Sequence, residues 1–376
     1  MRKAVRKLQA VSDLESAMIR LAGARGGISR VELARKMKLV PSTTGIYVDR
    51  LLAEGYLQET AVAVRGLGRP PVVLQLNPLA GQFVGVDFDA RQVCATAVDF
   101  AQQPLGQVRR TIPARATVER VLEVITDTIN HVAAAAQHKL LGIGLGVPGP
   151  VDTERGISLR YAFLPEWQDV PIGPRMAEHF HVPVSVENNL RSIALAELWA
   201  GQGRGLRNFV CLGVRSGIGS GIIINGQLLR GAHNLAGEIG RWACPSEFNE
   251  EGSSSSPTIE DLASLDALLK ESTIATVADL LTALDQRQRT VVSLVRRAAR
   301  VHAWVVHQLA TLFDPERIIV AGPLAEQDVY LSALQGGVAD FGGAALAAIL
   351  TPSLLGPFAG ASGGAALAFQ QWKPER

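Results

Sequence analysis

The chain contains 376 residues, of which 47% are apolar and 19% are charged. This length predicts two or three domains, and this composition excludes a mainly disordered chain. Three scattered cysteines exclude a disulfide framework, and no apolar core of signal-peptide length lies near the first residue, so we expect a protein of the reducing cytoplasm. Prolines and glycines interrupt the uncharged stretch 341–372, which favours a buried strand and helix over a membrane span.

The net charge of +2 is distributed unevenly along the chain. Residues 1–76 contain 13 Lys and Arg against 6 Asp and Glu, whereas the remaining 300 residues contain 24 against 29. A basic head on a mildly acidic body is typical of a nucleic-acid-binding domain joined to a second module. A solvated basic surface would carry the same charge, so charge alone leaves both interpretations open.

Residues 1–55 predict three helices. The segment 13–24 carries apolar side chains at the spacing of one helical face. Ser29, with Glu32 three residues further on, predicts the capped start of a short second helix. A third helix is expected between Pro41 and Gly55. Its inward-facing side chains are expected to be Ile46, Val48, Leu51 and Leu52.

Two strand-like runs, at 56–60 and 72–76, follow these helices and flank the turn sequence RGLGRPP. This order is typical of a winged helix-turn-helix, whose recognition helix enters the major groove and whose wing reaches phosphates or the minor groove. Duplex DNA would then be contacted from the exposed side of the third helix and from the wing tip. The candidate DNA-binding residues are Ser42, Thr43, Thr44, Tyr47 and Arg50 on the helix, and Arg65 and Arg69 on the wing. The alternative is that RGLGRPP is only a hairpin turn.

From residue 80 onward, strands alternate with helices, which predicts mixed α/β layers. The segments 83–100 and 209–230 each predict a hairpin around a polar or glycine-rich turn, and together they suggest a duplicated, two-lobed fold. The serine-rich insert at 247–257 predicts a flexible loop. The expected division is a winged helix-turn-helix domain over 1–78, a first α/β lobe over 79–186 and a second over 187–376.

Four motifs follow the winged helix with its GRPP tip: GVPGPVD, ENNLRSIALAELWAG, SGIGSGIIINGQLLRG and AGEIG. In this order they resemble the ROK family, which contains sugar kinases and the sugar-responsive repressors derived from them. The resemblance covers nearly the whole chain. It implies an actin/hexokinase-like (ribonuclease H-like) pair of lobes with a ligand cleft between them.

The resemblance also implies which residues would contact a sugar, whose hydroxyls need amides and carboxylates as partners. Asn188 keeps the family's sugar-binding amide, and Asn189 stands where the kinases have the aspartate that acts as catalytic base. Glu238 and Glu260 keep two further sugar contacts. Arg241 replaces a histidine and either pairs with Glu238 and closes the site, or recruits an acidic or phosphorylated sugar.

Two departures from the family's pattern predict that kinase activity is lost. An amide at Asn189 cannot accept the proton of the attacking hydroxyl. The first phosphate-binding turn, Asp87 to Arg91, lacks both glycines of the kinases, and Gly322-Pro323 replaces the paired glycines near the adenosine site. The intact glycine turn 216–221 is weak evidence because such turns also serve plain hairpins. We therefore expect no catalytic residue and no cofactor.

The zinc site of the family is also expected to be missing. Arg241 stands at the histidine position, and Thr258 stands where the last cysteine of the metal cluster would align. Cys244 alone cannot hold zinc.

These observations predict a DNA-binding transcriptional regulator, with a repressor favoured, whose C-terminal domain senses a sugar-like ligand. The expected partners are a duplex DNA operator, a small sugar-like effector and further copies of the chain in a homodimer or tetramer, with no membrane. One alternative is a regulator whose effector site has degenerated. Another is a sugar kinase with a regulatory DNA-binding head.

Overall fold

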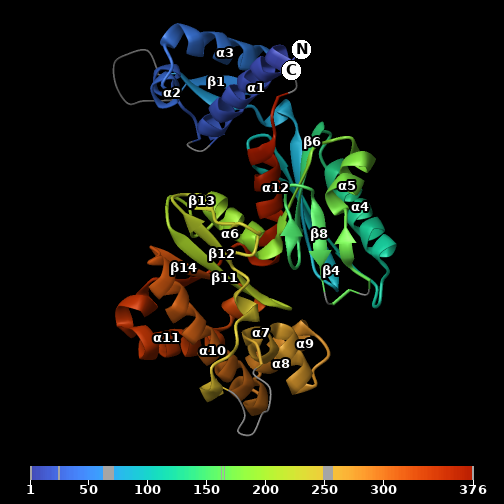
Figure 1. Ribbon diagram of the computed structural model, residues 1–376, viewed down its shortest axis with the longest axis vertical. Helices are drawn as coiled ribbons and strands as arrows, with labels where there is room; N and C mark the ends of the chain where they lie inside the picture. The colour runs from blue at the N-terminus through green and yellow to red at the C-terminus, as the bar shows by residue number, and fades with distance from the viewer. Residues whose placement is uncertain are drawn as a thin grey trace.

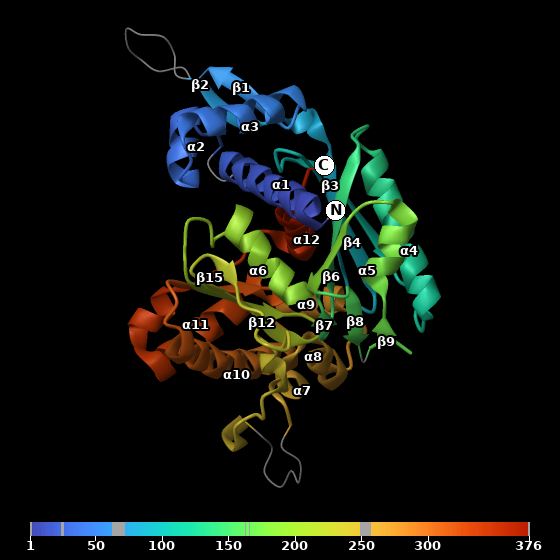
Figure 2. The same ribbon diagram turned by 45° about the horizontal axis from the view of Figure 1, so that its top comes forward.

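The structure, a computed structural model, describes residues 2–23, 26–61, 72–161, 163–164, 166–248 and 257–374. A small N-terminal head lies at one end of the long axis, and two α/β lobes follow it (Figure 1). The two ends of the chain lie close together beside the head in both views (Figures 1 and 2).

The head has the predicted order of elements. It consists of α1 (Arg2–Gly23), α2 (Arg30–Met37), α3 (Pro41–Ala53) and the antiparallel strands β1 (Leu57–Ala61) and β2 (Val72–Leu76). Ser29 caps α2 as expected, because its hydroxyl accepts a hydrogen bond from the N–H of Glu32 at 3.1 Å. The first helix begins at Arg2, eleven residues before the predicted start at 13.

The first lobe is built on a five-stranded sheet in the order β10-β6-β3-β4-β5. Its strands are β3 (Gln82–Phe88), β4 (Gln92–Asp99), β5 (Pro104–Thr111), β6 (Leu140–Val147) and β10 (Val184–Asn188). Helices α4 (Val118–Ala134) and α5 (Ile172–Phe180) pack on one face. Three short strands, β7 (Val151–Asp152), β8 (Ile157–Arg160) and β9 (Gln168–Val170), form a small separate sheet.

The second lobe repeats this plan, with a sheet in the order β13-β12-β11-β14-β15. Its strands are β11 (Phe209–Val214), β12 (Ile218–Ile224), β13 (Gln227–Leu228), β14 (Arg317–Ala321) and β15 (Leu350–Pro352). In both lobes an antiparallel hairpin comes first, and its first strand pairs in parallel with a later strand. The helices of this lobe are α7 (Ile259–Ala263), α8 (Leu265–Ser272), α9 (Val277–Asp285), α10 (Arg289–Phe313) and α11 (Asp328–Ala348). No helix in the described part of the chain is long and apolar enough to cross a membrane.

The last helix, α12 (Ala359–Gln371), returns to the first lobe and covers the second face of its sheet (Figure 1). Helix α6 (Asn189–Ala200) packs between α12 and the strands β11 and β12 of the second lobe. Glycines in β3 and β6 allow the backbone of α12 to approach the sheet closely. A Cβ atom on Gly85 would lie 1.8 Å from the carbonyl oxygen of Ala361, and one on Gly144 would lie 1.8 Å from that of Gly364. The predicted bounds of the second lobe, 187–376, therefore do not match the structure, because the last helix of that range packs on the sheet of the first lobe.

The head shares one hydrophobic core with the first lobe and α12. Phe83 of β3 lies 5.5 Å from Phe369 of α12 between ring centroids, and Tyr56 of the head lies 5.5 Å from Phe100 and 5.0 Å from Trp372. Met18, Leu51, Leu57 and Leu76 of the head belong to the same buried cluster. Near the end of the chain, Ser12 donates a hydrogen bond to the carbonyl of Pro374 at 3.0 Å. The head is therefore fused to the first lobe.

Replacing Phe369 with alanine is expected to lower the free energy of unfolding by about 3–5 kcal/mol, because it opens a cavity in this shared core. Phe369 is 1% exposed. The head and the first lobe should unfold together in a urea titration followed by probes in each. The control Leu354→Ala removes a side chain that is 75% exposed and should change the stability by less than about 0.5 kcal/mol. A head that melts separately, with an unchanged midpoint in Phe369→Ala, would contradict the fusion.

Candidate functional site

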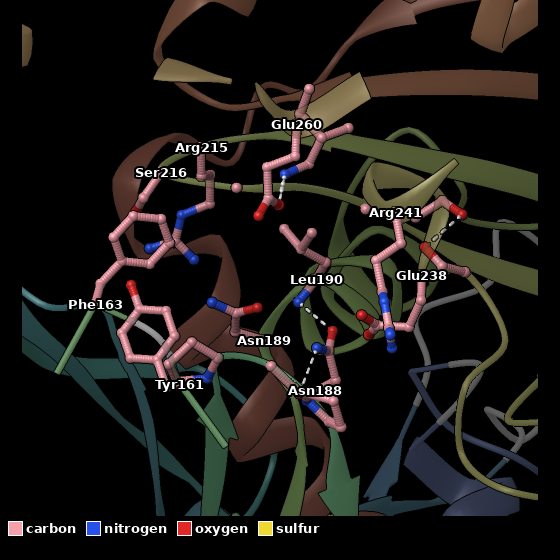
Figure 3. A pocket seen from close by; sticks show the side chains of 18 of the residues that line it. Tyr161, Phe163, Asn188, Asn189, Leu190, Arg215, Ser216, Glu238, Arg241 and Glu260 are labelled. Atoms are coloured by element: carbon pink, nitrogen blue, oxygen red, sulfur yellow. Dashed lines mark hydrogen bonds between the residues drawn. The ribbon is translucent and has the colours of Figure 1, made fainter. Parts of the chain in front are cut away.

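A cavity of about 330 Å³ lies between the lobes. The first lobe contributes the turn 148–150 and side chains after β8, α6 contributes its first turn, and the second lobe contributes the turn 215–220 and the loop that leads into the short helix η2 (Ile239–Arg241). Figure 3 shows the side chains converging from these segments. All five residues expected to contact a ligand line this one cavity: Asn188, Asn189, Glu238, Arg241 and Glu260.

Asn188 is held in place by its position between β10 and α6. Its Oδ1 accepts hydrogen bonds from the N–H groups of Leu190 at 2.9 Å and Arg191 at 3.2 Å, so it caps α6. Its Nδ2 donates to the carbonyl of Gly149 at 3.0 Å. An amide nitrogen carries two hydrogens, so one donor of a rigidly oriented group remains for a ligand.

Behind Asn188, the buried carboxylate of Glu187 joins two arginines. Its Oε1 lies 2.8 Å from Nε of Arg191, and its Oε2 lies 2.7 Å from Nε of Arg230. Arg191 also donates to the carbonyl of Asn234 at 2.8 Å. This network fixes the start of the loop that carries Glu238. Sequence reasoning missed it, although the Glu-Arg spacing of four residues at 187 and 191 was a usable signal.

The two glutamates of the cavity differ in their surroundings. Glu260 lies in the first turn of α7, and its Oε2 accepts a hydrogen bond from the N–H of Ile218 at 2.9 Å. Burial raises the pKa of both Glu238 and Glu260, and nearby Arg191 and Arg241 counteract the rise for Glu238. Among the described side chains, no ion pair joins Arg241 to Glu238, and both side chains line the cavity.

Three side chains of the cavity were not foreseen from the sequence. Arg160, at the end of β8, and the rings of Tyr161 and Phe163 form its first-lobe wall (Figure 3 shows the two rings). The ring of Phe163 is 42% exposed and offers an apolar surface to the C–H groups of a ligand. The sequence gives no periodic signal for these residues, because they lie between short strands.

Beside this cavity, a buried ion pair crosses between the lobes. The guanidinium of Arg215, directly after β11, lies 2.8 Å from Oδ2 and 3.1 Å from Oδ1 of Asp87, near the end of β3. The side chain of Asp87 is 1% exposed and that of Arg215 is 16% exposed. Burial raises the pKa of Asp87, whereas Arg215 and a hydrogen bond from Asn189 lower it. A second interlobe pair joins Arg91 to Asp266 at 3.0 Å.

A second cavity, of about 260 Å³, lies on the other side of this ion pair. Its walls include Arg109, Gly322 and Pro323, together with Asp87 and Arg215 themselves. Arg215 therefore lines both cavities.

The predicted DNA-binding residues of α3 divide into two groups. Ser42 is exposed and Thr43 is partly exposed, as expected. Thr44 was expected on the exposed side, but this is wrong: it is 1% exposed, and its hydroxyl donates to the carbonyl of Val40 at 3.2 Å. Ile46 was expected to face inward and is instead 63% exposed.

Tyr47 and Arg50 are partly buried by contacts within the head. Arg50 forms an ion pair at 3.0 Å with the fully buried Glu15 of α1, and its guanidinium lies 5.6 Å from the ring centroid of Tyr47. The wing residues Arg65 and Arg69 lie outside the described residues. Three exposed cations that the sequence prediction left out lie on and just after α2: Arg35, Lys36 and Lys38.

The region aligned with the family's zinc cluster is only partly described, because residues 249–256 lie outside the described ranges. Within the described ranges, no group of three or more His, Cys, Asp or Glu side chains is placed to hold a metal. Thr258 instead caps α7, accepting from the N–H of Asp261 at 3.2 Å while Asp261 accepts from the N–H of Thr258 at 2.9 Å.

Comparison with known proteins identifies the family. The family model described as the ROK family matches residues 83–371. The chain belongs to the ROK family.

Named relatives include repressors. The chain is 32% identical to the xylose repressor of Caldicellulosiruptor bescii over 57% of this chain and 54% of that one. It is 25% identical to the DNA-binding transcriptional repressor Mlc of Escherichia coli over 82% of this chain and 80% of that one. The crystal structure of a ROK family transcriptional regulator, a homolog of the E. coli Mlc protein, matches with a TM-score of 0.78 and 22% identity over 96% of both chains, which shows the shared fold.

Within the ROK fold, the Asp87–Arg215 pair joins the two turns that resemble the phosphate-binding turns of the kinases, 87–91 and 216–221. The guanidinium balances Asp87 from inside the chain, and Asp89 closes its turn by accepting from the N–H groups of Arg91 at 2.8 Å and Gln92 at 2.9 Å. The carboxylates of the first turn are therefore paired with groups of the protein itself.

Replacing Arg215 with alanine is expected to lower the free energy of unfolding by about 3–5 kcal/mol at neutral pH, because Asp87 keeps a buried charge without its cation. The loss should shrink as the pH falls. Without the guanidinium, the folded-state pKa of Asp87 rises further above its unfolded value of about 3.9, so between these two pKa values the folded state binds more protons and stability increases as pH is lowered. Urea unfolding across that pH range measures this.

Asp87→Asn in the Arg215→Ala background removes the unpaired charge and should recover most of the loss at neutral pH. Arg297→Ala, which breaks an exposed ion pair with Glu271, is the control and should cost less than about 1 kcal/mol. An equal loss of stability in Arg215→Ala and in the double variant Arg215→Ala, Asp87→Asn would contradict the assignment to a buried charge.

Proposed function

We propose that the protein is a DNA-binding transcriptional repressor that responds to a sugar or a sugar-derived ligand bound between its lobes. The observation that carries this proposal is a head of winged helix-turn-helix order, packed through a shared core onto a ROK domain that has an open interlobe cavity. The repressor names of two relatives support it. The cavity offers the mixture of amide, carboxylate, guanidinium and aromatic groups that recognises a polyhydroxylated ligand.

We propose further that the protein does not transfer phosphate. Asn189 has no basic group to take a proton from a sugar hydroxyl. In addition, Arg215 pairs with Asp87, so the charge of the first turn is balanced by the chain itself. The chemistry of the cavity is therefore binding without reaction.

The signal would pass from the cavity to DNA through movement of the lobes. The contacts across the cleft include the Asp87–Arg215 pair and a hydrogen bond at 3.3 Å from Thr153 to Asn234. A ligand that binds the closed and open arrangements with different affinity changes their populations, and only such a difference can drive a switch. In a homodimer or a tetramer, closure would change how two heads fit the two half-sites of an operator.

Ser42→Glu is expected to weaken binding to a DNA duplex on the order of tenfold while leaving the fold intact. An acidic residue in the first turn of α3 favours the helix, but it repels DNA phosphates. Binding should be measured by fluorescence anisotropy on a duplex that the full-length protein selects from a random library. We expect that duplex to contain an inverted repeat.

The matched control is Ser332→Glu, which makes the same change at an exposed position of α11 in the second lobe. A point variant is preferable to deletion of the head, because deletion would expose Phe83, Phe369 and Trp372 of the shared core. Equal affinity in both variants and the wild type, or failure to select any duplex, would contradict DNA binding through α3.

A panel of neutral sugars, sugar acids and sugar phosphates is expected to contain a ligand that raises the melting temperature. At 100 times its Kd such a ligand adds about 2.7 kcal/mol to stability. Glu260→Gln should weaken the binding of neutral sugars, because it removes a charged acceptor for their hydroxyls but keeps an oxygen for the N–H of Ile218. Arg241→Gln should weaken acidic or phosphorylated ligands selectively, because Arg241 has no ion-pair partner among the described residues.

The same panel with ATP is the control for catalysis, and no sugar phosphate should form, including in Asn189→Asp. Product above background would contradict the loss of kinase activity. No melting shift across the whole panel would leave a DNA-binding protein whose effector site has degenerated.

A further inference from the structure

The recognition helix exposes an apolar side chain in the middle of its outward face. Ile46 is 63% exposed, although Val48 and Leu51 on the opposite side of α3 are fully buried. One turn before it lie Ser42 and Thr43, and one turn after it lies Asp49. Ile46 thus lies between polar groups, and most of its apolar surface is not buried within the head.

Exposed apolar side chains concentrate in this part of the chain. Of the ten large apolar side chains that are exposed in the described residues, three lie between positions 31 and 46. Besides Ile46 these are Val31 at 79% and Val40 at 61%. Isolated exposed apolar residues are common, but a local concentration at a helix-turn-helix marks a contact surface.

The charges around Ile46 suit a polyanion. Arg35, Lys36 and Lys38 are exposed on and just after α2. The acid on the outward face, Asp49, forms an ion pair with Arg30 at 2.7 Å, which offsets part of its charge, and Arg30 also pairs with Glu59 at 2.9 Å. Val40 gives the first turn of α3 no side-chain acceptor, so the first N–H groups of that helix are open to a phosphate oxygen.

The docking geometry of a recognition helix determines which part of the DNA Ile46 would contact. A recognition helix enters the major groove with its N-terminal residues against the base edges, and phosphate contacts on either side fix its register. The 5-methyl group of thymine is the apolar group that the bases present in that groove. A side chain between Ser42 and Asp49 on the outward face points at the groove floor when the first turn of α3 is anchored on the backbone.

We infer that Ile46 is a specificity-determining residue that packs against thymine methyl groups in the major groove of the operator. This inference rests on the proposed DNA-binding function and adds to it the chemical feature that is recognised.

The test uses the full-length protein and the duplex that it selects from a random library. Each thymine of that duplex is replaced in turn by uracil, which removes only the 5-methyl group. At one or more positions in each half-site, this replacement should weaken wild-type binding about fourfold, the effect of one buried methyl group. In Ile46→Ala the same replacement should have almost no further effect, because its partner has already gone.

Leu312→Ala is the matched control. Leu312 is 65% exposed on α10 of the second lobe, and its variant should respond to uracil as the wild type does. Uracil that is neutral at every position, or equally harmful to the wild type and to Ile46→Ala, overturns the inference while leaving DNA binding intact. Failure to select any duplex contradicts the DNA-binding function itself. If Ile46→Ala changes the oligomeric state and leaves the uracil response unchanged, Ile46 packs against a second copy of the chain and the inference is wrong.

Discussion

The aromatic cluster around Phe83, Phe100, Phe369 and Trp372 joins three parts of the chain that are far apart in sequence. It connects the head, the first sheet and the last helix in one core, and Tyr56 reaches into it from the head. Since buried aromatic side chains each contribute several kcal/mol, the head cannot swing on a linker without exposing this surface. The head and the first lobe therefore move as one body, and the second lobe is the part that is free to move relative to DNA.

Against that rigid body, the Asp87–Arg215 pair determines how the second lobe is held. In a medium of low dielectric an isolated Asp87 carboxylate would be costly, and the guanidinium supplies the opposite charge from across the cleft. Here the chain satisfies the charge itself, while the neighbouring cavity around Asn188 and Glu260 stays open. The proposed loss of phosphate transfer and the retained cavity thus have separate physical causes.

Local patterns account for what the sequence could predict. The capped start of α2, the hairpin that opens each lobe and the motifs around Asn188 and Glu238 are short-range signals, and the structure has these elements. Side-chain direction on α3 was predicted less well. Thr44 was expected to be exposed and is buried, whereas Ile46 was expected to face inward and is exposed. A short helix with apolar residues on several sides has no single face that its sequence marks as buried. The return of α12 to the first sheet and the partner of Arg215, 128 residues away, depend on tertiary packing that no local pattern encodes.

These constraints limit how a ligand could control DNA binding. Two heads that were paired only through their own first lobes would keep a fixed spacing however the cleft closed, because each head is fused to its first lobe. Closure changes the spacing of half-sites only if the second lobes take part in holding the copies together. By linkage, the effector and the operator then alter each other's affinity by the same factor. The proposed function therefore requires an oligomer held at least partly through the second lobe, where the uncharged end of α11 is exposed.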